Sequence, residues 1–152
     1  MAGMERIPSK FGAVLLAADG PLVREVHLRN RGGADTAKGR LAADLRRYLD
    51  GARVDFARYD IDWSGYTTFE RSVLEATRKI PYGETRTYGE IAAEIGAPDA
   101  ARAVGQALGK NRTCIVVPCH RVVAANGGLG GFSGGIHWKR DLLALEGAPV
   151  RG

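Results

Sequence analysis

Two Thr-x-x-Glu sequences in the middle of the chain constrain its fold more than any other feature. They lie at Thr67–Glu70 and Thr87–Glu90. In such a capping box the threonine side chain and the glutamate side chain each satisfy a backbone N–H of the other residue, which marks the start of a helix. The first box is followed by apolar residues on one helical face: Phe69, Val73, Ala76 and Ile80. The pattern predicts a helix from each box.

The second of these helices is followed closely by a third. The second runs through Ile91 and Ile95, a turn follows at 96–98, and the third is predicted over Asp99–Leu108 and ends at Gly109. Two helices joined by a short glycine-containing turn have the outline of a helix-turn-helix. Most such helix pairs bind no nucleic acid, so the outline alone does not establish DNA binding.

The first third of the chain has a different pattern. Apolar runs on either side of Asp19-Gly20 predict a β-hairpin over residues 11–28. The spacing over Thr36–Leu49 predicts a helix that Gly51 ends, and the alternation at Val54 and Phe56 predicts a further strand. Residues 57–66 have the composition of a linker. We therefore expect an α/β domain over residues 1–62 and a mostly helical domain over residues 63–152.

Composition sets only broad limits on function. Of the 152 residues, 45% are apolar, and the net charge is +5, which is compatible with a DNA partner without requiring one. No apolar run approaches the roughly 20 residues that span a bilayer, and the start has no secretory pattern, so we expect a cytoplasmic protein without membrane contact. Two cysteines make no disulfide framework, and no spacing of cysteine and histidine indicates a metal site.

Both cysteines of the chain lie in one short segment, residues 114–119. The β-branched run 115–117 predicts a buried strand that Pro118 ends, and Cys119, His120 and Arg121 follow. A thiol beside a histidine and an arginine is in a setting that favours the nucleophilic thiolate. A third group should orient the histidine, and either Asp141 or Glu146 has a suitable position downstream. The alternative is that Cys119, like Cys114, is a buried apolar residue.

The sequence from Pro118 to Val123 resembles the active-site signature of the O6-alkylguanine-DNA alkyltransferases. Other segments match this family in the same order: 80–85, 88–92, 102–105 with 107, 132–135, 139, 142–143 and 146–147. The resemblance covers residues 67–147 in detail and residues 11–56 in outline. It implies an α/β fold with a small ribonuclease-H-like domain of sheet and helix, followed by a winged helix-turn-helix-like domain that carries the active site.

The resemblance also implies the chemistry. Cys119 would take the alkyl group of O6-alkylguanine in DNA and keep it as a thioether, so each molecule would act once. His120 would accept the thiol proton through a water, with Glu146 rather than Asp141 orienting its ring, and Asn111 would hold the turn before the active site. No cofactor or metal is required. O4-alkylthymine is a further possible substrate.

The DNA contacts follow from the same resemblance. Arg102 would enter the base stack in place of the extruded nucleotide, and Tyr88 would help to rotate that nucleotide out. Small residues such as Ala101 and Gly105 would let the recognition helix approach the minor groove. The guanine would be bound by residues near the cysteine: Cys119 and Val122 through their carbonyls, and Ser133 through its backbone N–H. The expected form is a monomer bound to duplex DNA.

This chain departs from the family pattern at a few positions. Arg112 stands where a proline commonly follows the asparagine, and Phe132 stands where some relatives have tyrosine. Two other functions compete with alkyl transfer: a protein that binds the lesion without chemistry, and a sequence-specific regulator. The first conflicts with the presence of Cys119. The second conflicts with the scarcity of long polar side chains on the recognition helix.

Overall fold

The computed structural model describes residues 3–30, 32–130 and 135–149. The chain forms two compact units. One unit, here called the sheet unit, comprises Met1–Asp62 and Arg112–Val116, and the other, the helical unit, comprises Trp63–Asn111 and Val117–Gly152. The expected mixed α/β class is confirmed. The segment Arg112–Val116, which the sequence assigned to the second domain, packs with the first unit instead.

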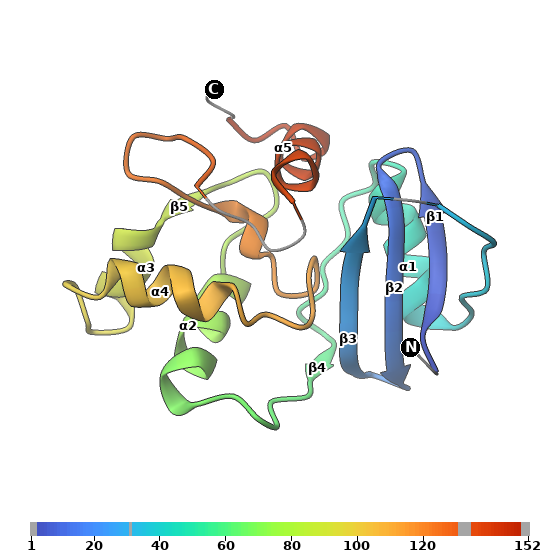
Figure 1. The fold of residues 1–152 in the computed structure, drawn as a ribbon, viewed down its shortest axis with the longest axis horizontal. Helices are drawn as coiled ribbons and strands as arrows, with labels where there is room; N and C mark the ends of the chain where they lie inside the picture. The colour runs from blue at the N-terminus through green and yellow to red at the C-terminus, as the bar shows by residue number, and fades with distance from the viewer. Residues whose placement is uncertain (1–2, 31, 131–134, 150–152) are drawn as a thin grey trace. The chain divides into compact units, whose positions relative to one another are not determined.

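The sheet unit is built on four strands in the order β1-β2-β3-β4 (Figure 1). Strands β1 (Glu5–Ser9), β2 (Gly12–Asp19) and β3 (Leu22–Arg29) pair antiparallel, and β4 (Asp60–Ile61) runs parallel to β3. The predicted hairpin is confirmed, with Asp19 opposite Leu22 and Gly20 at a φ of 57° in the turn. Strand β1 was not predicted from the sequence.

Helix α1 packs beside the sheet and is shorter than predicted. It covers Arg40–Leu49 rather than Thr36–Leu49. The backbone N–H groups of Thr36 and Ala37 donate to the carbonyl of Arg6, and the Thr36 hydroxyl accepts from the Arg6 N–H. These bonds tie the segment to β1, and Gly39, just before the helix, has a φ of 96°, which a helical turn does not allow.

The predicted strand at Val54 and Phe56 is wrong. Both side chains are buried, but residues 52–56 form no strand. The Phe56 ring packs edge-on against Tyr48 of α1, with ring centres 5.8 Å apart. The alternation therefore reflects packing against a helix. The strand that does join the sheet, β4, lies in the segment predicted as a linker, where Tyr59 and Ile61 are buried.

The helical unit contains α2 (Thr68–Arg78), α3 (Tyr88–Glu94), α4 (Ala101–Leu108) and α5 (Ile136–Leu145). Both capping boxes are confirmed by their reciprocal hydrogen bonds, and α4 begins at Ala101 rather than Asp99. Two short strands, β5 (Arg86–Thr87) and β6 (Val122–Val123), pair in parallel, and a 3-10 turn, η1, covers Cys119–Arg121. Among the described residues, no helix has the length and apolar character needed to cross a membrane.

Candidate active site

The approach to Cys119 is a series of tight turns and not the predicted strand. Residues 115 and 116 are in a turn, so the expected strand over 115–117 is wrong, although all three side chains are buried. The Cys119 N–H donates to the Val117 carbonyl at 2.8 Å across Pro118, whose φ and ψ are −79° and 62°. These angles define an inverse γ-turn. Pro118 therefore turns the chain directly into η1.

Ile115, within the sheet unit, has an uncommon backbone conformation. Its φ is 72°, in the left-handed region that β-branched residues rarely adopt, and the N–H of Val116 donates to the carbonyl of Cys114 at 2.8 Å. The segment is held directly before this turn, because the Cys114 N–H donates to the Val26 carbonyl and the Val26 N–H to the Arg112 carbonyl. Pairing with β3 thus maintains a strained turn just before the active-site residues.

Asn111 connects the end of α4 to Cys119. Its Nδ2 donates to the carbonyl of Val117 and also to the Sγ of Cys119, each at 3.1 Å. Asn111 and Cys119 are both buried, at 5% and 4% exposure. An amide donor at the sulfur stabilises a thiolate more than a thiol, since it interacts with the growing negative charge. This contact supports a nucleophilic Cys119.

His120 and Glu146 form a buried pair. The Nε2 atom of His120 lies 2.7 Å from Oε2 of Glu146, and both side chains are fully inaccessible to solvent. Burial lowers the pKa of His120, and the Glu146 carboxylate only partly opposes this effect. The imidazole is therefore held neutral near pH 7, as a general base must be. Of the two carboxylates left open by the spacing, Glu146 is the one in contact with His120.

Glu146 accepts more than the histidine hydrogen bond. Arg121 donates from Nε to Oε1 at 2.8 Å and from Nη2 to Oε2 at 3.0 Å, and the Gly83 N–H donates to Oε1 at 3.1 Å. Burial would raise the pKa of the Glu146 carboxyl, but its hydrogen bonds to His120 and Arg121 hold that pKa well below its ordinary value. Arg121 was quoted in the sequence motif, but its pairing with Glu146 was not predicted.

A buried lysine is a second residue whose setting the sequence did not predict. Lys139 of α5 is 1% exposed, and its Nζ lies 5.7 Å from the ring centre of Tyr88. Burial lowers the pKa of Lys139 to about 8, an effect that Cys119 partly opposes. The sequence linked Lys139 only to the family pattern. Its apolar neighbours Trp138 and Leu142 are the signal that could have indicated burial.

The residues expected to contact DNA occupy α3, α4 and β6. Tyr88 begins α3 and is half-buried, Arg102 is exposed on α4, and Ala101 and Gly105 share that helix. A methyl group on Gly105 would lie 3.7 Å from the Tyr88 ring, so the two helices approach closely at that point. Val122 is buried in β6. Phe132 and Ser133 lie outside the described residues.

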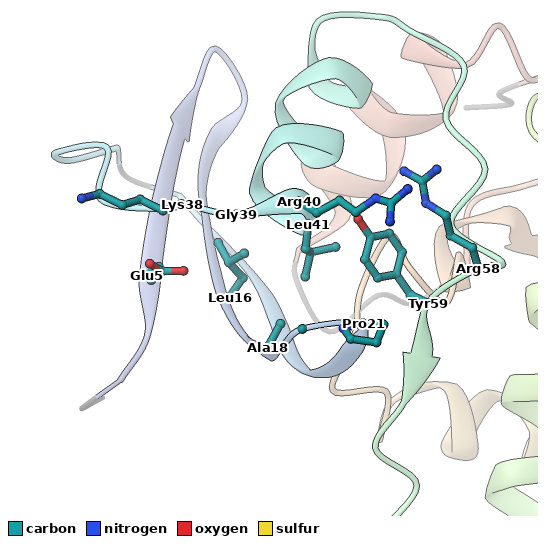
Figure 2. A pocket seen from close by; sticks show the side chains of 11 residues that line it. Glu5, Leu16, Ala18, Pro21, Lys38, Gly39, Arg40, Leu41, Arg58 and Tyr59 are labelled. Carbon is teal, nitrogen blue, oxygen red and sulfur yellow. The ribbon is translucent and has the colours of Figure 1, made fainter.

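The sheet unit contains a separate hollow of about 460 Å³ (Figure 2). Leu16, Leu41 and Tyr59 lie deepest in it, since each is nearly inaccessible, and Arg40 and Arg58 are exposed at its rim. Among the described residues that line it there is no cysteine or histidine, and none was predicted as a site residue.

Known proteins resemble this chain in both sequence and structure. A relative from Mycobacterium tuberculosis, named methylated-DNA–protein-cysteine methyltransferase, is 54% identical over 102 residues, which are 67% of this chain and 61% of the relative. The matched part thus spans about three-fifths of that relative's length. A Mycobacterium leprae protein of the same name is 42% identical over 147 residues, covering 91% of this chain and 88% of the relative.

A solved structure of Mycobacterium tuberculosis OGT in complex with DNA has a TM-score of 0.80 to this chain. It is 40% identical and covers 96% of this chain and 94% of its own. Residues 68–148 match the model of the family described as 6-O-methylguanine DNA methyltransferase, DNA binding domain. These residues include α2 to α5 and the cluster around Cys119, so the resemblance extends through the whole candidate site. The chain belongs to the 6-O-methylguanine DNA methyltransferase family.

Proposed function

We propose that this protein repairs alkylated DNA by transferring the alkyl group of O6-alkylguanine to the Sγ of Cys119, once per molecule. One observation carries the proposal: a buried cysteine accepts a hydrogen bond from Asn111 and directly precedes a histidine paired with Glu146. A cysteine next to a histidine that a carboxylate orients supplies the residue types on which activated nucleophiles depend. The names of the relatives supply the substrate class.

The transfer is a single displacement at carbon. Because Nε2 of His120 is engaged by Glu146, the Nδ1 atom accepts the Cys119 proton through a water. The thiolate forms a carbon–sulfur bond as the bond between carbon and guanine O6 breaks. The guanine leaves with the electron pair and regains a proton at N1, which matches the proton lost by the thiol. A thioether is a poor leaving group, so the protein is not regenerated.

The target carbon lies inside a duplex, so the nucleotide must first be turned out of the stack. We assign Arg102 to the vacated position, because it is exposed on α4 beside small residues that permit close approach to the minor groove. Tyr88 lies against Gly105 of that helix and is assigned to the rotation of the nucleotide. The carbonyls of Cys119 and Val122 and the N–H of Ser133 are assigned to the guanine.

Intact-protein mass spectrometry tests the proposal directly. The protein is incubated with a short duplex that carries one O6-methylguanine, and we expect a gain of one methyl group that maps to Cys119 and saturates at one per molecule. Cys119→Ser should remain unmodified while still binding the duplex. Binding of the lesion without any mass gain in the unmodified sequence would instead indicate a protein that recognises the lesion without chemistry.

A further inference from the structure

The turn at Ile80–Gly83 surrounds Arg121 and Glu146, and the proposed transfer assigns it no role. The Ile80 carbonyl accepts from Nη1 of Arg121 at 2.7 Å, and the Tyr82 ring centre lies 5.8 Å from the centre of the guanidinium. The Gly83 N–H donates to Glu146 at 3.1 Å. One short turn therefore contacts both members of the ion pair. A surface salt bridge would have no such enclosure.

The hydrogen bonds of Glu146 are arranged so that each carboxylate oxygen has two donors. Oε1 accepts from Arg121 and Gly83, and Oε2 accepts from His120 and Arg121. Arg121 binds with two parallel donors, Nε and Nη2, on one edge of its guanidinium, in the fork geometry that lysine cannot reproduce. Its side chain is 9% exposed and that of Glu146 is fully buried. The pair is thus strongly shielded from water.

We propose that Arg121 is a positioning residue that keeps Glu146 ionised and leaves the His120 imidazole neutral, ready to accept the Cys119 proton. A buried carboxylate without a countercharge would attract a proton onto the adjacent imidazole, because the imidazolium would be its nearest available cation. With Arg121 present, the carboxylate is already neutralised. Glu146 then orients the ring, and the amount by which it raises the pKa of His120 stays smaller than the lowering caused by burial. This inference rests on the proposed function.

The charges balance before and after activation. At rest, Arg121 and Glu146 cancel, and His120 and Cys119 are neutral. After proton transfer the imidazolium and the thiolate cancel each other, so the buried site carries no net charge from these four groups in either state. Lys139 on α5 is the other charged group that acts on His120, and like Arg121 it disfavours the imidazolium. Low net charge limits the cost of working in a site shielded from water.

Paired substitutions separate charge from geometry. Arg121→Met removes the charge, and Arg121→Lys retains it without the fork. The acid limb of the transfer rate, measured against pH on O6-methylguanine duplex, should move upward by about one pH unit in the methionine variant. The limb should stay in place in the lysine variant, with a rate lower by about 10-fold. Arg71→Met, at an exposed arginine of α2 paired with Glu75, is the control and should change neither quantity.

The protonation of His120 itself supplies a readout that does not need transfer. Imidazole resonances in NMR should show His120 protonating at higher pH in Arg121→Met than in the unmodified sequence, with His27 and His137 as internal references. Unchanged titration of His120, or an equal shift in the lysine variant, would overturn the inference. Failure of the proposed function would appear differently, as no methyl gain in the unmodified sequence at any pH.

Discussion

In the described part of the chain, each compact unit buries one cysteine and one carboxylate that pairs with arginine, but the two carboxylate sites differ in how far the arginine side chains are exposed to water. In the sheet unit, Asp44 accepts from the Tyr59 hydroxyl at 2.6 Å and pairs with Arg58 and Arg47, whose side chains are 46% and 61% exposed. In the helical unit, the arginine partner of Glu146 is only 9% exposed, and its second partner is a buried histidine.

The partners of Asp44 are those of a structural carboxylate, whereas the partners of Glu146 fit a role in proton transfer. Burial would raise the pKa of Asp44, but hydrogen bonds from Tyr59 and Arg58 lower it, and these partners do not change protonation near neutral pH. Glu146 has the same kind of neutralising partner, and in addition it contacts His120, whose ordinary pKa lies close to neutrality. Under the proposed function, Glu146 is set apart from Asp44 by its titratable neighbour and not by burial alone.

Matched isosteric substitutions give the largest expected effects. Glu146→Gln should slow transfer to Cys119 by about 100-fold or more, because the amide no longer fixes the charge and orientation of His120. Asp44→Asn should leave the transfer rate unchanged. Both variants should unfold at lower urea concentration. The expected loss is about 3–5 kcal/mol for Glu146→Gln, which leaves Arg121 buried without a charged partner, and about 1–3 kcal/mol for Asp44→Asn.

Single-turnover rates and urea unfolding measure these two effects separately. The rates should be taken at saturating protein and at a temperature where both variants remain folded. A transfer rate that falls equally in the two variants would mean that both carboxylates act only through stability. In that case the distinction between the two units would be lost.

The comparison extends to the arginines of the helical unit, because Arg102 is exposed on α4 whereas Arg121 is buried. Arg102→Ala should slow transfer from duplex DNA by about 10-fold, since nothing replaces the extruded nucleotide in the stack. Transfer from free O6-methylguanine base should be unaffected. Rates on the two substrates check this expectation, and an equal loss on both would assign Arg102 to the chemistry rather than to the duplex.

Lys139 should make the stability of the protein depend on pH on the alkaline side. Its pKa is about 8 in the folded protein and 10.5 ordinarily, so the unfolded chain binds the extra proton between these values. The free energy of unfolding should therefore rise with pH across that window. Lys139→Met should raise the free energy of unfolding below about pH 8 by on the order of 3 kcal/mol and remove this rise. Urea titrations from pH 7 to about pH 10 test it, with exposed Lys110→Met as the control.

Local patterns predicted the parts of the fold that depend on neighbouring residues. The hairpin turn at Asp19-Gly20 and the two capping boxes needed only short-range hydrogen bonds, and all three are present. Val54 and Phe56 were misread because their burial is against α1, which the alternation of a few residues cannot distinguish from a sheet. Strand β4 has only two residues and forms by pairing with β3, so no pattern in its own neighbouring residues predicts it.

The residues of the candidate site can be chosen from the sequence, but their backbone conformation cannot. Cys119, His120 and Glu146 were selected from a motif, and the structure places His120 against Glu146 and Asn111 against Cys119. The β-branched residues at 115–117 favour a strand locally. The turn at Ile115 follows directly on residues that pair with β3, far away in the sequence. Long-range pairing therefore overrides local preference where the chain approaches the nucleophile.

The smallest expected effect concerns Cys114, the cysteine of the sheet unit. It tests whether thiol reactivity is confined to the helical unit. Cys114 is buried like Cys119, at 3% exposure, but its backbone pairs with Val26 in the sheet unit. Cys114→Ala should leave the rate and stoichiometry of methyl transfer unchanged and should lower the free energy of unfolding by about 1 kcal/mol through lost packing. Mass mapping after reaction, together with urea unfolding, measures both quantities.

A methyl group found on Cys114, or a slower transfer in the Cys114→Ala variant, would show that Cys114 takes part in the reaction and that a buried thiol alone suffices for it. Because Cys114 is not followed by a base paired with a carboxylate, we expect neither.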